Sequence, residues 1–166
     1  MEKLSYRDAQ KSDLQRIVDI YNTIVAGRMV TADEVEVTVE DRLVWFEAHN
    51  PNTRPLLVIE NEDQNVIAWV SFQSFYGRSA YNKTAEISIY IDPAFRGKGL
   101  GKRILNDMKL QAPQYGIETI LAFIFQHNVP SMTLFQKQGF EIYGNLPEVA
   151  ELDGIKRSLI ILGCKV

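Results

Sequence analysis

The alternation of apolar and polar residues in the middle of the chain predicts a strand followed by a helix. Residues 86–91, Glu-Ile-Ser-Ile-Tyr-Ile, alternate with a period of two, which is typical of a strand with one buried face. Asp92 and Pro93 end this strand, because proline cannot donate to a strand ladder. After a glycine-rich segment, apolar residues recur at helical spacing: Leu100, Ile104, Leu105, Met108 and Ala112. Pro113 ends that helix.

The same patterns predict the elements on either side. Before the central pair they predict a strand at 4–7, a helix capped by Ser12 or Asp13 that ends at Gly27, a helix capped by Thr38, and strands at 56–59 and 66–75. After it they predict a strand at 117–125, a helix from 128 to Gly139, and strands at 140–143 and 155–162. This order predicts an α/β fold with one mixed sheet covered by helices on both faces, in a single domain over residues 1–166.

Composition and charge narrow the function classes. The chain has 166 residues, of which 46% are hydrophobic, and a net charge of -3, so its surface as a whole does not attract nucleic acid or an anionic membrane. The single cysteine, Cys164, lies in an apolar run and is expected to be a buried thiol. His49 and His127 are far apart in sequence, so no metal site is expected. No apolar run has membrane-spanning length and no signal peptide is evident, so we expect a cytoplasmic protein.

The basic, glycine-rich segment 96–102, Arg-Gly-Lys-Gly-Leu-Gly-Lys, lies between the strand and the first turn of the helix. The first N–H groups of a helix have no partner within it, and the helix dipole there favours an anion. Glycines let a phosphate approach those N–H groups closely. The segment matches neither the P-loop nor the dinucleotide fingerprint. It predicts a pyrophosphate site, and the alternative is a glycine-rich turn before a solvated basic helix start.

The pattern Arg-x-x-Gly-x-Gly at 96–101, after a strand and at the start of a helix, resembles the acetyl-CoA-binding motif of the GNAT acetyltransferase superfamily. Further matching segments are Ile20-Tyr21-Asn22, Arg42-Leu43-x-Trp45-Phe46, 84–91, and Asn128-x-x-Ser131 with Leu134 and Gly139-Phe140. The resemblance covers the full chain and is closest to the phosphinothricin and L-amino acid N-acetyltransferases. It implies the GNAT fold, in which the central mixed sheet is splayed.

The resemblance also implies how acetyl-CoA binds. The pyrophosphate would rest on the backbone of residues 97–102, and the pantetheine arm would pair with the main chain of the central strand in the gap beside strand 117–125. The implied cofactor-binding residues are Ile89, Tyr90, Ile91, Arg96, Gly97, Lys98, Gly99, Leu100, Gly101, Lys102, Asn128 and Ser131. Asn128 and Ser131 are also well suited to cap a helix, and one residue can serve both purposes.

Transfer to nitrogen needs a neutral amine. Deprotonating an α-amino group with a pKa near 8 costs only about 1.4 kcal/mol at pH 7, so a base is useful but need not be strong. Glu86 matches the catalytic glutamate of the family and is predicted to be this base, with its pKa raised by burial. The alternative is a solvated glutamate at a strand start. Because no nucleophile with a paired base stands out, we expect direct transfer without an acyl-enzyme.

The acceptor site is predicted from the loop before Glu86. Arg78, Tyr81 and Asn82 lie where relatives hold the acceptor, and an arginine can pair with a carboxylate through two hydrogen bonds. A solvated loop arginine is the alternative. Three aromatic residues, Trp45, Phe46 and Trp69, are expected in the core, with a pocket or dimer surface as the other interpretations.

Two departures from the family pattern affect the mechanism. The family often has a histidine at the position of Phe135, and phenylalanine cannot protonate a departing thiolate. The segment 146–157 also lacks the Lys-Phe-Gly-x-Trp sequence common in the family.

These residues lead to one main interpretation and two rivals. The main one is a homodimeric N-acetyltransferase that uses acetyl-CoA and a small, carboxylate-bearing amine acceptor of the phosphinothricin or methionine sulfoximine type. A protein N-terminus or a polyamine is the second acceptor class, favoured if Asp33, Glu34 and Glu36 form an open acidic groove. A non-catalytic acyl-CoA sensor is the third interpretation, motivated by Phe135.

Overall fold

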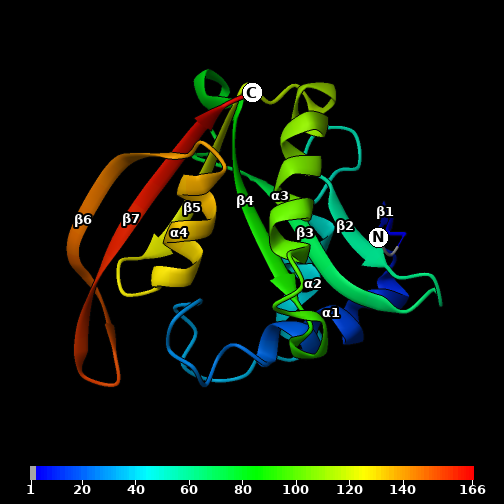
Figure 1. Ribbon diagram of the computed structural model, residues 1–166, viewed down its shortest axis with the longest axis horizontal. Helices are drawn as coiled ribbons and strands as arrows, with labels where there is room; N and C mark the ends of the chain where they lie inside the picture. The colour runs from blue at the N-terminus through cyan, green and yellow to red at the C-terminus, as the bar shows by residue number, and fades with distance from the viewer. Residues whose placement is uncertain (1–2) are drawn as a thin grey trace.

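A seven-stranded mixed sheet runs through the protein in a computed structural model that describes residues 3–166 (Figure 1). The strand order across the sheet is β1-β2-β3-β4-β5-β7-β6. The strands are β1 (Ser5–Asp8), β2 (Leu56–Glu60), β3 (Val66–Ser74), β4 (Thr84–Ile91), β5 (Thr119–Phe125), β6 (Glu141–Leu152) and β7 (Ile155–Lys165). Only β4 and β5 are parallel, and every other neighbouring pair is antiparallel. The predicted mixed sheet and the predicted order of elements are confirmed.

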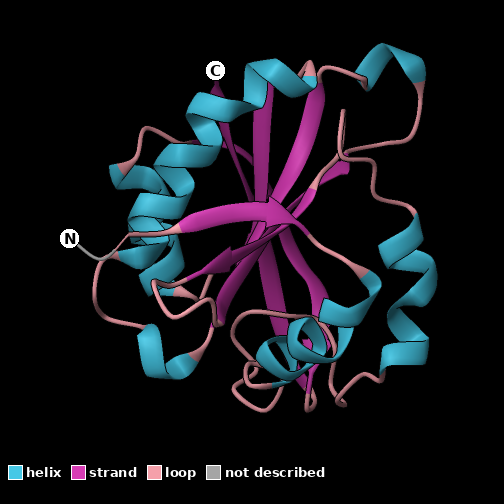
Figure 2. Cartoon of the chain, turned by 90° about the vertical axis from the view of Figure 1, so that its right-hand side faces the viewer, coloured by secondary structure: helices cyan, strands magenta, loops and turns pink. Residues whose placement is uncertain are grey.

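Helices lie on both sides of the sheet (Figure 2). They are α1 (Leu14–Asn22), α2 (Val39–Glu47), α3 (Leu100–Gln111) and α4 (Val129–Lys137). On one face, α3 and α4 pack on alternate residues of the central strands, and on the other face α1 and α2 pack on the intervening residues of β2, β3 and β4. Strands β2 and β3 therefore bury residues on both of their faces.

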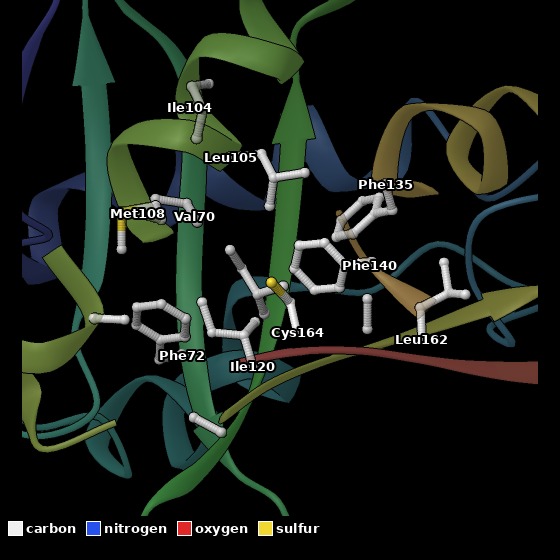
Figure 3. Close-up of a cluster of buried hydrophobic side chains, with 14 of the residues drawn as sticks. Val70, Phe72, Ile104, Leu105, Met108, Ile120, Phe135, Phe140, Leu162 and Cys164 are labelled. Atoms are coloured by element: carbon white, nitrogen blue, oxygen red, sulfur yellow. The ribbon is translucent and has the colours of Figure 1, made fainter. Parts of the chain in front are cut away.

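The larger core lies between the sheet and α3 and α4 (Figure 3). Met108 of α3 and Phe72 of β3 are fully buried there, and the rings of Phe135 and Phe140 meet edge to face at 5.0 Å. Cys164 is buried in the same cluster, as predicted. Truncating one of these large side chains to alanine typically costs about 2–5 kcal/mol.

The core on the opposite face is built on aromatic rings. Trp69 is buried, its indole N–H donates to the Ile17 carbonyl at 3.1 Å, and its ring lies 4.4 Å from that of Tyr90. Trp45 packs edge to face on Trp69 at 5.4 Å. These tryptophans are core residues, as expected. Phe46 also packs against this cluster.

Several element ends differ from the sequence-based expectation. Helix α1 ends at Asn22 and is followed by turns, so Gly27 lies beyond its end. The largest difference is β6, which continues to Leu152 and was expected to end at 143. Bulges between Ile142 and Gly144 and between Leu146 and Ala150 shift the register of β6. They break the period of two by which a strand is recognised in sequence.

The cap of α2 follows the prediction: Thr38 Oγ1 accepts from the Asp41 N–H at 3.2 Å, and the Asp41 carboxylate accepts from the Thr38 N–H at 2.8 Å. Within residues 3–166, no helix is long and apolar enough to cross a membrane.

Candidate active site

The central feature of the site is a gap between β4 and β5. The two strands pair only at Thr84–Thr119, Ala85–Ile120 and Glu86–Leu121, and they separate beyond Glu86. A cavity of about 70 Å³ occupies the gap, lined by residues 87–90 of β4, 122–124 of β5, and Asn128, Ser131 and Phe135 at the start of α4. The gap therefore lies where the resemblance implies that the sheet is splayed.

The backbone of β4 offers hydrogen-bonding groups to this gap. The Asp92 N–H donates to the Ile67 carbonyl at 2.9 Å, in register with the ladder between β3 and β4. In an antiparallel strand, the main-chain N–H and C=O groups of successive residues point to opposite edges. Those of Ser88 and Tyr90 therefore bond to β3, whereas those of Ile89 and Ile91 point towards the gap. Of the three predicted main-chain partners of pantetheine, Tyr90 therefore has its N–H and C=O in the ladder with β3.

The glycine loop leads from β4 into α3. Gly97 and Gly99 have φ values of +76° and +77°, a left-handed conformation that is costly for residues with a side chain, and Gly99 is the N-cap of α3. Gly101 faces the core: a Cβ there would lie 3.3 Å from Leu134 Cδ2 and 3.5 Å from Ile91 Cδ1. The first N–H groups of α3 thus follow a loop with two glycines in the left-handed conformation, a feature typical of a phosphate site.

The Arg96 side chain bonds to the two elements that flank the glycine loop, β4 and α1. Its Nε donates to the Ile91 carbonyl at 2.9 Å and its Nη2 donates to Thr23 Oγ1 at 3.2 Å. These bonds connect the end of β4 and the end of α1 to the loop. In this geometry Arg96 serves to hold the loop in place. The sequence pattern identified the residue but not this role.

The start of α4 forms the third side of the gap. Asn128 is buried, and its Oδ1 accepts from the Ser131 N–H at 3.2 Å, so the predicted capping role is confirmed. Both residues also line the cavity, as cofactor-contacting residues would. Phe135 lines it too and is buried against Phe140, so this position holds an apolar ring with no proton to donate.

Glu86 is the last residue of β4 that pairs with β5, so it lies at the mouth of the gap. It is opposite Gln73 on β3 and Leu121 on β5, and its side chain is half-buried. Burial raises the pKa of the Glu86 carboxyl above its usual value, because the charged form loses hydration. Burial also raises the pKa of Tyr90, which lies four residues further along β4 on the same face of the strand. A carboxylate with a raised pKa is better suited to accept a proton.

The loop between β3 and β4 carries an aromatic cluster. Phe75 stacks on Phe123 at 6.3 Å and meets Tyr81 edge to face at 5.7 Å, which places the loop beside the wall of the gap. Arg78 is exposed and, within residues 3–166, forms no ion pair. The Asn82 carbonyl accepts from Arg54 at 2.6 Å. All three predicted acceptor residues are thus exposed, and Tyr81 belongs to this aromatic cluster.

The acidic residues of the α1–α2 loop are engaged in structural contacts. Asp33 accepts from Arg42 at 3.1 Å and from the Tyr21 hydroxyl, and Glu34 accepts from the Asp153 N–H at 3.1 Å. The Arg42 guanidinium lies 4.3 Å from the centroid of the Tyr21 ring. Sequence reasoning missed this network, which ties the loop to α2 and to the β6–β7 hairpin. The segments are too far apart in sequence for any spacing rule to connect them.

Comparison with known proteins gives one family match and many similar structures. The model of the acetyltransferase (GNAT) family matches residues 17–140. A Bacillus subtilis protein that is 53% identical over 96% of this chain and 98% of its own length carries a provisional name as a phosphinothricin acetyltransferase. An L-methionine sulfoximine/L-methionine sulfone acetyltransferase from Pseudomonas paraeruginosa is 32% identical over 90% of this chain and 87% of its own length.

Two solved structures of similar proteins contain acetyl-CoA. One is a phosphinothricin acetyltransferase from Sinorhizobium meliloti, with a TM-score of 0.89, 27% identity, and coverage of 98% of this chain and 88% of that chain. The other is a Salmonella typhimurium protein described as an acetyltransferase with acetyl-CoA, with a TM-score of 0.88, 29% identity, and coverage of 98% and 94%. The fold of the present chain, with its splayed sheet, is therefore the fold of these proteins.

Proposed function

Because the chain belongs to the acetyltransferase (GNAT) family and uses acetyl-CoA as cosubstrate, we propose that it acetylates the α-amino group of a small amino acid of the phosphinothricin or methionine sulfoximine type. The observation that carries this proposal is the gap between β4 and β5, which has open main-chain groups on one side and Glu86 at its mouth. The names of the similar proteins supply the acceptor class.

The acetyl-CoA site is proposed in two parts. The pyrophosphate rests on the N–H groups of residues 97–102, where the α3 dipole and the charges of Lys98 and Lys102 favour an anion. The pantetheine arm pairs with the main chain of Ile89 and Ile91, adding a strand-like partner to the open edge of β4. Since the Ile91 carbonyl already accepts from Arg96, its N–H is the group left for pantetheine. Asn128 and Ser131 contact the arm from α4.

Glu86 is proposed as the general base. The acceptor enters as an ammonium ion, and Glu86 takes one proton from it, directly or through a water molecule, to free the nitrogen lone pair. The raised pKa of Glu86 narrows the difference in proton affinity between the carboxylate and the amine, which favours this transfer.

The amine then attacks the thioester carbonyl in a direct transfer. The C–N bond forms, the C–S bond breaks, the nitrogen releases its second proton to solvent, and coenzyme A leaves as the thiolate. Phe135 cannot protonate this thiolate. Coenzyme A thiolate is a fair leaving group, so the reaction can proceed without a side-chain acid at that position.

The acceptor carboxylate is proposed to pair with Arg78, with Tyr81 and Asn82 beside it. Arg78 carries the positive charge that a carboxylate needs as a partner. Among residues 3–166 it forms no ion pair, so its guanidinium is open to a ligand. A polyamine acceptor is less well supported, because Asp33 and Glu34 are already bonded to Arg42 and to the Asp153 N–H. The ion pair with Arg42 compensates the charge of Asp33, which reduces the negative charge that the loop presents to a cationic acceptor.

A homodimer is proposed on the apolar face of β5, β7 and β6 that α1 and α2 leave uncovered. Cross-strand pairing puts Phe123 with Ile161 on one side of the sheet, and Tyr76 and Tyr143 are 63% and 49% exposed nearby. Light scattering on a size-exclusion column should give twice the subunit mass. The substitution Tyr76→Glu should shift that mass towards the monomer.

Thiol release in the presence of acetyl-CoA tests the proposed activity. We expect turnover with phosphinothricin or methionine sulfoximine and none with spermidine or with peptides that have a free N-terminus. Turnover restricted to polyamines or peptides would refute the acceptor class. Tight acetyl-CoA binding without turnover on any amine would instead favour the sensor interpretation.

A further inference from the structure

A second pocket, of about 370 Å³, lies where the turn between β5 and α4 meets the β6–β7 hairpin. Its lining consists entirely of polar and charged side chains: Gln126, His127, Glu148, Lys156, Arg157 and Ser158. None of these residues lines the gap between β4 and β5. The pocket is therefore separate from the proposed active site, and the reaction described above leaves it without a role.

The pocket holds two cations that have no ionic partner. Within residues 3–166, neither Lys156 nor Arg157 lies within 4.0 Å of a carboxylate oxygen, although Glu148 lines the same pocket. The Nε of Arg157 is buried and has no hydrogen-bond partner. A buried N–H without an acceptor is destabilising, and an anion is the partner that a guanidinium binds best. Two neighbouring cations without an ion pair are notable in a chain whose net charge is -3.

His127 contributes a third nitrogen. Its Nε2 lies 2.7 Å from the Arg28 carbonyl, and because a carbonyl can only accept, Nε2 carries the hydrogen. The other ring nitrogen, Nδ1, is buried without a partner. With the hydrogen on Nε2, Nδ1 is an acceptor and can take a hydrogen bond from the O–H of a hydrogen phosphate ion.

The walls of the pocket are fixed before any ligand binds. Glu148 lies in the bulge of β6 with a φ of +51°, and its N–H donates to Ser158 Oγ at 3.0 Å. The Gln126 N–H donates to the Ser158 carbonyl at 3.0 Å. Arg28, which holds His127, also pairs with Asp153 at the tip of the hairpin at 2.7 Å. Three segments of the chain are thus held together around the pocket.

We propose that this pocket binds an oxyanion, a phosphate or carboxylate group, at Lys156 and Arg157, and that Nδ1 of His127 accepts from the hydroxyl of a hydrogen phosphate ion. The anion could be free or could be the distal end of an acceptor. His127 is next in sequence to Asn128, which lines the gap, so the pocket adjoins the proposed active site. An acceptor that reached it would carry a second anionic group in addition to the carboxylate beside its amine.

Calorimetric titration with inorganic phosphate tests this proposal. The enzyme should be saturated with coenzyme A beforehand, so that the start of α3 is occupied, and the ionic strength should be held constant. We expect phosphate to bind to this complex, and Lys156→Ala/Arg157→Gln to weaken binding at least tenfold. The matched control Lys11→Ala/Lys137→Ala removes two exposed charges elsewhere and should leave binding unchanged.

Two results would overturn the proposal: phosphate binding that disappears when coenzyme A is present, or binding that is equal in the double variant and its control. Circular dichroism shows whether the double variant folds. If it does not, Lys156→Ala, which changes one exposed side chain, takes its place and should weaken binding several-fold. NMR of the His127 ring gives a separate readout, and ring shifts that do not respond to phosphate would contradict the role of His127.

Steady-state kinetics then distinguishes the two sources of the anion. If the site binds the end of an acceptor, phosphate should raise the KM of an acceptor with a distal carboxylate but not that of a simple amino acid. If the site binds a free anion, neither KM should rise. Both outcomes require the pocket to bind the anion, and neither depends on which acceptor the active site prefers.

Discussion

The two halves of β4 differ in the number of strands with which they pair. Residues 84–86 pair with β5, and Ala85 and Glu86 also pair with β3 on the other side, whereas residues 87–91 pair with β3 alone. Both halves alternate in the same way, and alternate residues pack on the core below α3: Ala85 in the first half, and Ile87, Ile89 and Ile91 in the second. The second half therefore differs from the first in its partner strand, and not in its alternation.

This difference shows how a sheet can form a binding site without special side chains. Main-chain groups of Ile89 and Ile91 that face the gap need a partner, and an amide-rich ligand supplies it. Glu86 lies at the boundary, where the last pair with β5 is formed, so it is both anchored and next to the open edge. The predictions below test this division, beginning with the largest expected effect.

Glu86→Gln tests the boundary position. The amide keeps the shape of the side chain but cannot accept the proton, so we expect kcat/KM to fall by about 10²–10³, within the usual range for loss of a general base. Because the pKa of Glu86 is raised, wild-type activity should increase with pH across that raised pKa, and the variant should lose this dependence. A thiol-release pH profile measures both. An unchanged profile in the variant would assign the base to another group.

The same substitution should stabilise the fold at neutral pH. A carboxyl whose pKa is higher in the folded protein stays protonated there while the unfolded chain has already lost its proton, so stability falls as pH rises through this range. Glutamine removes that penalty. We expect Glu86→Gln to unfold at a higher temperature than the wild type at pH 8 and at the same temperature at pH 4. A lower unfolding temperature at pH 8 would contradict the assignment of burial as the cause.

Proline substitutions compare the two edges of β4 directly. Ile89→Pro removes an N–H that faces the gap, so we expect acetyl-CoA affinity to fall about tenfold, the loss of one hydrogen bond to the ligand. Ser88→Pro removes an N–H from the ladder with β3 and should cost about 2 kcal/mol of stability or more. Calorimetry and chemical denaturation give the two quantities.

The control for the side chain is Ile89→Ala, which loses the same packing but keeps the N–H. Its affinity for acetyl-CoA should stay closer to that of the wild type than the affinity of Ile89→Pro does. Equal affinities in the two variants would mean that the open edge of β4 is not where pantetheine binds.

Gly99→Ala tests the loop that follows the open half. Its φ of +77° makes any side chain strained, while no atom lies within 4 Å of the added Cβ, so the cost to stability should be only about 1 kcal/mol. Coenzyme A affinity should fall more, by about tenfold, because the Cβ lies at the proposed phosphate site. Gly154→Ala is a matched control, since it shares the positive φ and the open surroundings but lies in the β6–β7 turn. It should lose stability alone.

The sequence predicted the fold to the extent that its elements are local. Period-two and helical patterns, the Thr38 capping box and the proline and glycine stops all depend on residues close in the chain. The bulged strand β6 was missed beyond residue 143, because two register shifts within it remove the alternation that a periodicity argument needs.

For the site, the sequence predicted residue types but not contacts. Glu86 was predicted from the resemblance to the family, and the glycines and Asn128 from short motifs at the starts of helices. The depth of the gap between β4 and β5 depends on where pairing stops, and no sequence rule states that position. The bond from Asp33 to Arg42 and the pocket around Arg157 likewise join segments that only the fold brings together.

Arg96 gives the smallest of the expected effects and the most specific one. Its guanidinium joins the Ile91 carbonyl, at the end of the open half of β4, to Thr23 at the end of α1. Because the side chain is exposed and each bond contributes about 1 kcal/mol, we expect Arg96→Ala to leave stability nearly unchanged. Loosening the loop should raise the KM for acetyl-CoA about threefold to tenfold while kcat changes less than twofold, because the groups at Glu86 stay in place.

Thr23→Val removes one of the two bonds and should give about half of that effect on the free-energy scale, measured in the same assay. If Arg96 instead binds the pyrophosphate directly, Thr23→Val will leave the KM unchanged while Arg96→Ala raises it at least tenfold, as expected when a charged group is lost from an ionic ligand. The ratio of the two effects therefore decides whether this arginine acts on the ligand or on the edge of β4 that receives it.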